Sequence, residues 1–363
     1  MSVMLFMPSK YGFSVWRWEN VIDVMIEKSE GVREIHLMRI IGLVEADFNC
    51  ALKILYSNRL MVNAETAGIL QDQWEDSKNR DALTCATRGL LASESVRTMK
   101  KTIIACSADA AACFGRVRSA YALVPCMKKR MTESCCKCAS PVVRKLCHSV
   151  KTNAGVFAKS YRQEDGDDEL TGIPRGTAHI VAMHTMVSDT MLARMKTLAN
   201  KDANHFVITF ADDSKTAHRT VDMYVDDATM CVGCSDHEEL FPCTSDADDD
   251  DSMQQHSAQL HESSLETTAR MAKAILRWTQ LKYIVDQGPE FSKYGFQMLT
   301  WKNVDGSLEP ATSEETPCAV TVKDQFGHSH KEIRRVEPDE SLEGLGFLDG
   351  TWGPNSPAPQ GNQ

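Results

Sequence analysis

The segment VDMYVDDATMCV, residues 221–232, constrains the fold more than any other part of the chain. Two adjacent aspartates, Asp226 and Asp227, stand between two short apolar runs whose alternation is typical of β-strands. Neighbouring side chains on a strand point to opposite faces, so both carboxylates reach one place only at a turn. We therefore predict a β-hairpin with this pair at its tip. The pair is either a polar β-turn or a carboxylate site whose repulsion is relieved by divalent cations.

A third acid favours the metal-site hypothesis. Asp109 follows the apolar strand-like run TIIACSA and precedes a helical segment, which places it at a strand end. Carboxylates at neighbouring strand ends can bridge two metal ions about 3.5 to 4 Å apart, an arrangement that promotes phosphoryl transfer. Mg²⁺ suits such an open acidic site, with Mn²⁺ as the alternative ion. The pair Asp212 and Asp213 has no apolar strand after it, so we prefer Asp226 and Asp227.

The rest of the chain mixes strand-like and helical segments and has no internal repeat. Strands are predicted in segments 21–28, 35–48 (turning helical near Asn49), 102–110, 205–211, 221–225 and 291–301. Helices are predicted in 66–100, 113–131, 179–200 and in a segment whose apolar stripe is Met271, Ile275, Trp278, Leu281 and Val285. We expect this stripe to be core and the acidic runs 164–169 and 246–251 to be loops.

Composition bounds the class of protein. The chain has 363 residues, a formal net charge of −10 and 13 cysteines. No apolar run approaches the roughly 18 residues of a membrane span, and the start MSVMLFMPSK lacks the features of a signal peptide. An odd cysteine count in a chain of this length favours reduced thiols. We expect an intracellular protein, nuclear or cytoplasmic and not secreted, with no membrane partner.

Six segments, taken in order, resemble the reverse transcriptases of eukaryotic retroelements, especially the non-LTR type. They are MIEKSEGVREIHLMRIIGLVEADFN in the fingers, SADAAACFGRV as the first palm motif, LTGIPRGTAHIVAMHTMVSD as the glycine-rich palm loop and helix, the signature YVDD, the following motif GPEFSKYGF, and LEGLGF, which is similar to the primer grip. YVDD and GIPRG are the most specific of these. The resemblance covers most of the chain, from Met25 to Phe347.

This resemblance implies the architecture of a right-hand polymerase. The fold would be α+β, with an antiparallel palm sheet, packed helices and fingers, and with the thumb largely absent. Residues 1–100 would form the fingers, and residues 101–310 would form the palm with inserted fingers-side helices and acidic loops. Residues 311–363 would hold the start of the thumb or connection and a disordered tail.

The resemblance also implies the reaction, which is RNA-directed DNA synthesis. A primer 3′-OH would attack the α-phosphate of a dNTP on an RNA or DNA template, with two Mg²⁺ ions. Asp109, Asp226 and Asp227 match the metal ligands, with the ions held between Asp109 and Asp226 and with Asp227 as a weaker or structural partner. Lys293 matches the lysine beside the leaving pyrophosphate. Phe114 matches the aromatic gate that excludes a ribose 2′-OH. The other residues that the resemblance assigns to nucleotide or template binding are Lys28, Arg39, Gly172, Arg175 and Gly176.

Two departures from the family motivate an alternative function. Arg175 stands where the family usually has Gln, and Gly115 stands where close relatives often carry an acid. A catalytically decayed copy retained as a nucleic-acid-binding module would have this appearance. Mg²⁺-dependent incorporation of dNTP separates the two hypotheses, because a decayed copy would still bind template.

Two groups of cysteines raise the question of zinc. One joins Cys135, Cys136 and Cys138 with Cys147 and His148, and the other joins Cys231, Cys234 and Cys243 with His237 or His256. Neither group has the paired spacing of common zinc sites, so buried or free thiols are the favoured interpretation and zinc is the alternative.

Overall fold

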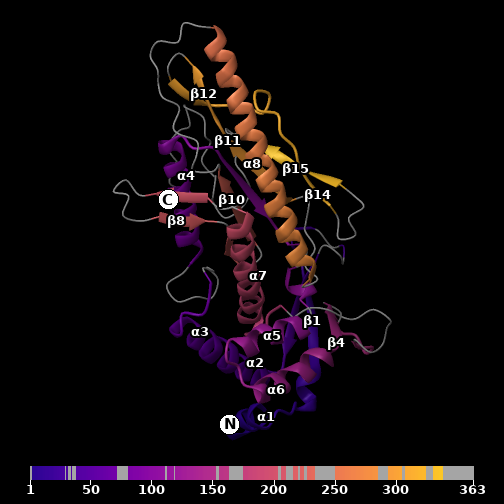
Figure 1. Cartoon of the computed structure of the whole chain (residues 1–363). Helices are drawn as coiled ribbons and strands as arrows, with labels where there is room; N and C mark the ends of the chain where they lie inside the picture. The colour runs from indigo at the N-terminus through magenta and orange to yellow at the C-terminus, as the bar shows by residue number, and fades with distance from the viewer. Residues whose placement is uncertain are drawn as a thin grey trace, which may run out of the picture. The chain divides into compact units, whose positions relative to one another are not determined.

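Figure 1 shows the computed structural model of the chain, which forms two compact units. The first comprises residues 1–79, 112–190 and 285–287, and the second comprises residues 80–111, 191–284 and 288–363. The structure describes residues 2–28, 30–31, 34, 38–71, 81–110, 113–117, 119–152, 155–162, 175–202, 206–209, 216–219, 221–224, 227–233, 250–284, 293–304, 307–323 and 330–337.

The second unit is built on a six-stranded sheet in the order β14-β15-β11-β3-β10-β9. The strands are β3 (Ile103–Ala108), β9 (Val221–Tyr224), β10 (Asp227–Gly233), β11 (Gly295–Leu299), β14 (Val320–Lys323) and β15 (His330–Val336). Every pairing in this sheet is antiparallel except that of β11 with β15. All six residues of β3 are buried, so this strand is the centre of the sheet and of the core.

Helix α8 (Asp250–Ile284) packs against β3, β10 and β14 of this sheet (Figure 1). Met271, Ile275 and Trp278 recur at helical spacing and are fully buried, so the predicted core stripe is confirmed for these positions. The helix begins at Asp250, so the last two residues of the acidic run 246–251 are helical and the loop prediction was wrong for them.

Helix α4 (Ala82–Met99) packs its buried face, at Ala92 and Val96, against Ile103 of β3 and Trp301. Asp81 caps the N-terminus of this helix, because its carboxylate accepts a hydrogen bond from the Thr84 N–H at 2.6 Å. The helix confirms the C-terminal part of the helical prediction for 66–100. Two further hairpins belong to the same unit, formed by β7 (Phe206–Thr209) with β8 (Thr216–Arg219) and by β12 (Trp301–Val304) with β13 (Ser307–Pro310).

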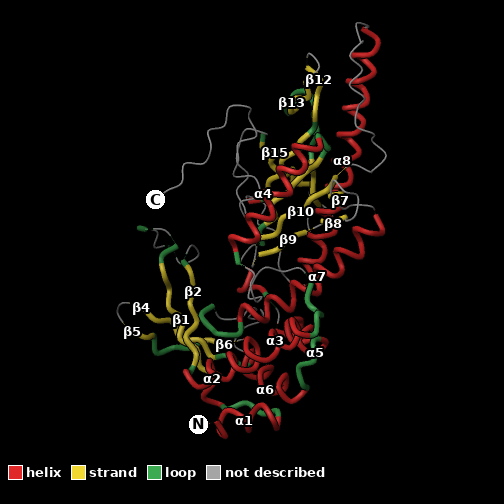
Figure 2. Tube along the Cα trace, turned by 90° about the vertical axis from the view of Figure 1, so that its left-hand side faces the viewer, coloured by secondary structure: helices red, strands yellow, loops and turns green. Residues whose placement is uncertain are grey.

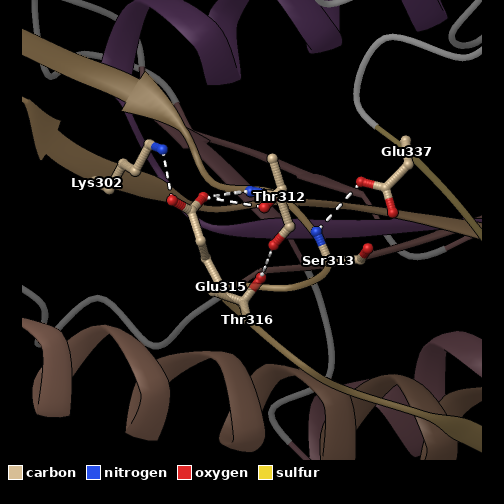
Figure 3. Close-up of polar contacts among 6 residues, drawn as sticks. All are labelled: Lys302, Thr312, Ser313, Glu315, Thr316 and Glu337. Carbon is tan, nitrogen blue, oxygen red and sulfur yellow. Dashed lines mark hydrogen bonds and ion pairs between the residues drawn. The ribbon is translucent and has the colours of Figure 1, made fainter.

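The turn after β13 is held by its own Glu315 together with Lys302 of β12 and Glu337, the residue after β15 (Figure 3). The Glu315 carboxylate accepts hydrogen bonds from Lys302 Nζ at 2.6 Å and from the Thr312 N–H at 2.8 Å. These contacts lower the pKa of Glu315 below its usual value, and the hydrogen bond from Lys302 is the largest cause. The Ser313 N–H donates to Glu337 at 3.2 Å. The segment after Pro310 is thereby tied to the main sheet, which β14 and β15 then extend.

The first unit combines a smaller sheet with a layer of helices (Figure 2). The sheet has the order β2-β1-β4-β5, with β6 also paired to β4, and its β1–β4 pairing is parallel. The strands are β1 (Asn20–Ile26), β2 (Arg39–Val44), β4 (Cys147–Thr152), β5 (Gly155–Val156) and β6 (Tyr161–Arg162). The helices are α1 (Ser2–Tyr11), η1 (Trp16–Glu19), α2 (Ala46–Leu52), the π-helical η3 (Lys53–Met61), α3 (Val62–Thr66), η4 (Cys113–Arg116), α5 (Ser119–Lys128), α6 (Glu133–Arg144) and the first part of α7 (Ile180–Asp202).

These elements confirm the α+β fold class, with antiparallel-rich sheets and packed helices. The strand predictions at 21–28, 102–110 and 221–225 and the helix prediction at 179–200 are also confirmed. The division at residues 100 and 310 into fingers, palm and thumb stays a prediction. None of the helices that the structure describes is long and apolar enough to cross a membrane.

Candidate functional site

Two of the predicted acids lie at the same edge of the main sheet. Strands β3 and β10 are antiparallel neighbours, and their last register pair is Ala108 with Ala228. Asp109 follows β3 directly and Asp227 is the first residue of β10, so the register places these residues opposite each other. Strand β9 then pairs its Tyr224 with Asp227, which confirms the predicted hairpin. Asp226 lies outside the described residues, as do Asp212 and Asp213.

The two carboxylate oxygens of Asp109 differ in their surroundings. Oδ2 forms an ion pair with Lys293 Nζ. Oδ1 is buried and has no hydrogen-bond partner among the residues that the structure describes. A buried carboxylate oxygen without a donor is costly in apolar surroundings, and it is the type of atom that a hard divalent cation binds. The Asp109 side chain is only 11% exposed, so its position is set by packing.

The third neighbour at this edge comes from the strand on the other side of β3. Strand β11 pairs with β3 through Gly295 and Ser107, and Lys293 precedes this strand. Lys293 is half exposed, with its ammonium group on the Asp109 carboxylate. The site therefore contains two acids and one lysine, from three adjacent strands. A carboxylate pair fits Mg²⁺ or Mn²⁺, and the free oxygen of Asp109 supplies a ligand position for it.

Phe114 and Arg175, both in the first unit, form a second cluster. The Arg175 guanidinium lies over the Phe114 ring, 5.4 Å from its centroid, a cation–π geometry. The His184 ring meets Phe114 edge-on at 5.2 Å. His184 Nε2 in turn lies 2.8 Å from the Cys113 sulfur. Phe114 therefore contacts both a cation and an imidazole.

Sequence reasoning missed His184 and Cys113 as part of this cluster. His184 is fully buried on α7. The feature of the sequence that could have pointed to it is a histidine on the apolar face of a predicted helix. Cys113 directly precedes Phe114, so it lay within a segment already singled out. The two residues are 71 positions apart in the chain, and no local pattern links them.

The glycine-rich loop contacts strand β2. Gly176 has a φ of +100°, and a Cβ built there would approach the Ile41 side chain at 2.8 Å and the Gly42 carbonyl oxygen at 3.1 Å. The Gly42 N–H also donates a hydrogen bond to the Arg175 carbonyl at 2.5 Å. Only glycine fits this position, because both the backbone conformation and the close approach exclude a side chain. Gly172 lies outside the described residues.

Lys28 and Arg39 lie at one end of the β1–β2 hairpin. Arg39 opens β2 opposite Ile26, the last residue of β1, and Lys28 follows two positions later. Both side chains are exposed, so they can meet an anionic ligand in solvent. Their assignment to nucleotide or template stays a prediction.

The cysteine groups do not form a metal centre in the described part of the chain. No cluster of three or more His, Cys, Asp or Glu side chains there could hold an ion. His148 of the first group pairs instead with Asp23, at 2.9 Å. Cys231 of the second group is buried in the core against Ile103 and Ala105. Cys234, His237 and Cys243 lie outside the described residues.

A buried histidine near the glycine-rich loop makes stability depend on pH. His179 is fully buried beside Tyr56, and burial lowers the pKa of its imidazole from 6.5 to about 3. The unfolded chain binds this proton below about pH 6.5 and the folded chain does not, so acidification favours unfolding. We expect His179 to remove roughly 2 kcal/mol of unfolding free energy between pH 7.5 and pH 5.

Urea denaturation at the two pH values measures this effect. The variant His179→Phe keeps an aromatic ring beside Tyr56 and removes the titrating group. Between pH 7.5 and pH 5 its unfolding free energy should fall by roughly 2 kcal/mol less than the parent's. Equal losses in parent and variant would assign the pH dependence to other groups.

The comparisons with known proteins gave structural likenesses only. The sequence matches no protein-family model, and a search of curated proteins found no match. Telomerase from Candida tropicalis in complex with a TWJ fragment of telomeric RNA is similar with a TM-score of 0.48 at 9% identity, over 81% of this chain and 45% of that one. The Candida albicans telomerase complex gives 0.44 at 9% identity, over 84% and 47%. Apo C. tropicalis telomerase truncated from its C-terminal domain gives 0.42 at 10% identity, over 81% and 55%. This chain thus spans about half the length of these telomerase chains.

Proposed function

We propose that this chain is the fingers and palm portion of an RNA-directed DNA polymerase of a retroelement, of the non-LTR type. The observation that supports this most is the edge where Asp109 and Asp227 lie opposite each other on adjacent strands, with Lys293 on the Asp109 carboxylate. The order of motifs along the sequence, from fingers through YVDD to primer grip, supports the same function. The partners would be a primed RNA or DNA template and a dNTP, in the nucleus or cytoplasm.

The chemistry would be attack of a primer 3′-OH on the α-phosphate of the dNTP, with pyrophosphate as the leaving group. Asp109 and Asp227, together with Asp226, would hold two Mg²⁺ ions, or Mn²⁺, which when bound supply the positive charge that phosphoryl transfer requires. Asp109 would offer the Oδ1 atom that has no protein donor among the described residues. Its buried position fixes that oxygen before substrate arrives, which lowers the cost of reorganisation.

Lys293 would act on the leaving group. Its ammonium rests on Asp109 and is half exposed, so it can reach an anion at the same edge of the sheet. There it would stabilise the charge that develops on pyrophosphate, or donate a proton to it. Asp109 keeps the ammonium at the site by charge attraction in the absence of that anion.

The second cluster would select and hold the nucleotide. Phe114 would block a ribose 2′-OH by its bulk, while Arg175, Gly172 and Gly176 would form the loop that meets nucleotide or template. Gly176 allows the close approach of this loop to β2. Lys28 and Arg39 would contact the triphosphate, the first as a point charge and the second as a planar fork.

A second candidate function is a nucleic-acid-binding module without catalysis. The observation that favours it is the guanidinium of Arg175 over the Phe114 ring, since the planar cation covers the face of the proposed gate. Such a module would keep the basic contacts to phosphate, which need no metal chemistry.

Primer extension on a poly(rA) template with Mg²⁺ or Mn²⁺ tests the polymerase against the module. We expect extension by the parent and a loss of about 10²-fold or more in Asp227→Asn, because the charge of one ligand is removed while the side-chain volume is kept. Glu309→Gln, an exposed carboxylate on β13, is the charge-matched control and should extend like the parent. Template binding without extension by the parent would support the second candidate.

A further inference from the structure

The backbone that carries Arg175 is fixed at two points by the rest of the first unit. The Arg175 carbonyl accepts a hydrogen bond from the Gly42 N–H of β2 at 2.5 Å. Three residues later, the Ala178 N–H donates to Asn49 Oδ1 of α2 at 2.7 Å, and the Ala178 carbonyl accepts from Ser57 Oγ of η3 at 3.2 Å. One strand and two helices therefore hold this short segment at both ends.

The residues that follow Arg175 are packed as well as hydrogen-bonded. Gly176 lies so close to β2 that a side chain there would collide with Ile41. Thr177 is 3% exposed and His179 is 2% exposed. A backbone whose polar groups are paired and whose neighbours are buried opens rarely, so the position of the Arg175 Cα is set before a ligand binds.

The side chain of Arg175 uses this fixed position to contact a ring that a ligand can reach. Its guanidinium lies 5.4 Å from the centroid of Phe114, and both side chains are partly exposed. The ring belongs to η4, whose first residue Cys113 is fully buried. A cation at this distance is attracted to the negative face of an aromatic ring. Rotation of Phe114 away from Arg175 would lose that attraction, so the contact favours one position of the ring.

His184 of α7 restricts the same ring by a second contact. The two rings meet edge-on, with centroids 5.2 Å apart. His184 is fully buried, and its Nε2 and Nδ1 atoms lie 2.8 Å from Cys113 Sγ and 3.5 Å from Ser188 Oγ. The imidazole is therefore itself fixed in place. Phe114 has one neighbour set in the core and a second, Arg175, set by a hydrogen-bonded segment.

We propose that Arg175 is a positioning residue that fixes the Phe114 ring and thereby sets how strongly the protein prefers deoxyribonucleotides to ribonucleotides. The inference rests on the proposed function, in which Phe114 blocks a ribose 2′-OH, and it adds the residue that makes the block effective. A ring excludes a hydroxyl only if moving the ring aside is costly, because specificity of this kind comes from a clash with the wrong ligand. The cation–π contact supplies part of that cost.

Incorporation of dTTP and UTP by the full chain on primed poly(rA) tests this role. The measured quantity is the ratio of kcat/KM for dTTP to kcat/KM for UTP, in which a contact made equally to both nucleotides cancels. We expect Arg175→Gln to lower the ratio by about 3- to 30-fold, because the ring loses its cation. Arg116→Gln is the matched control, since it removes the same charge from an exposed position two residues after Phe114, and its ratio should equal the parent's.

Two further comparisons separate support of the ring from a general effect of the substitution. Arg175→Lys keeps a cation but not the planar guanidinium, so its ratio should fall less than that of Arg175→Gln. In a Phe114→Ala background, Arg175→Gln should leave the ratio unchanged, because no ring remains for the cation to restrain. A merely structural role of Arg175 would lower the ratio by the same factor with and without the ring.

The segment that carries Arg175 gives an independent test at a residue remote from Phe114. Asn49→Leu removes the acceptor of the Ala178 N–H and should lower the ratio in the same direction as Arg175→Gln, but by less. Asn49→Asp keeps an oxygen acceptor at the same position and should restore most of the parent's ratio. Thermal unfolding curves of both variants will show whether each is folded at the assay temperature.

The outcomes distinguish this inference from the polymerase function. A parent that extends with dTTP and UTP equally, or an unchanged ratio in Arg175→Gln, would overturn the inference and leave the polymerase function standing. A parent that incorporates neither nucleotide would refute the polymerase function, and the Kd values of dTTP and UTP in Ca²⁺, with primed template, then replace the ratio. A preference for dTTP that weakens in Arg175→Gln would support the inference, whereas an unaltered preference, equal binding or no binding would overturn it.

Discussion

Asp109→Asn is expected to reduce primer extension by about 10³-fold or more while leaving template binding unchanged. The substitution keeps the volume of the side chain but removes the negative charge that the Oδ1 atom would offer to Mg²⁺. The substitution also weakens the attraction between residue 109 and the Lys293 ammonium, because their ion pair becomes a contact with a neutral amide. Single-turnover extension over a range of Mg²⁺ concentrations measures the loss, and it should persist at saturating metal.

Lys293→Gln is the companion variant for this site. It removes the ammonium but leaves both acids, so the loss of rate should be smaller, roughly 10²-fold, and should appear in kcat more than in KM for dNTP. The half-exposed position of Lys293 makes a folding defect in this variant unexpected. Extension by Asp109→Asn at the parent's rate would exclude Asp109 as a metal ligand and would remove the main support for the polymerase function.

Asp189→Ala is expected to lower the free energy of unfolding by about 3 to 5 kcal/mol. Asp189 on α7 is buried, and its Oδ2 lies 2.6 Å from Lys129 Nζ. Its Oδ1 accepts the Gln71 N–H, and Lys129 also donates to the Ile69 carbonyl. Truncation leaves the Lys129 side chain, only 15% exposed, without its carboxylate, and leaves the Gln71 N–H without its acceptor.

The double variant Asp189→Leu with Lys129→Met distinguishes the cost of an unpaired charge from the value of the pair. Replacing a buried pair by apolar side chains of similar volume is often neutral, so the double variant should recover most of the lost stability. Denaturation by urea, followed by tryptophan fluorescence, measures each value. Equal losses in the single and double variants would show that packing at Asp189, and not its charge, stabilises this part of the first unit.

Local patterns predicted those parts of the fold that short segments specify. The alternation in VDMYVDDATMCV predicted the β9–β10 hairpin, since register and turn are both contained in twelve residues. The helical spacing of Met271, Ile275 and Trp278 predicted the buried face of α8 for the same reason. Asp109 was predicted at a strand end because an apolar run stops directly before it.

These local patterns did not predict contacts between segments that are distant in the chain. Asp109 and Lys293 are 184 residues apart, and β1 pairs in parallel with β4, which begins at Cys147. Asp23, His148 and Tyr161 come from three strands, and nothing near any of them in the chain points to the other two. Such pairings depend on how sheets and helices pack, because the free energy of a long-range contact is spread over the whole core.

The features of the candidate sites also fall into two groups, those that the sequence predicted and those that only the tertiary structure determined. The residue types came from the sequence, because an acid pair at a hairpin tip, a strand-end aspartate and a glycine-rich loop each have a local signature. The environment of each group came from tertiary packing, which buries Asp109 Oδ1, places Arg175 over Phe114 and sets Asp23 beneath His148 and Tyr161. Burial and partner atoms are properties of the assembled core, and they decide what charge a side chain carries and what it can bind.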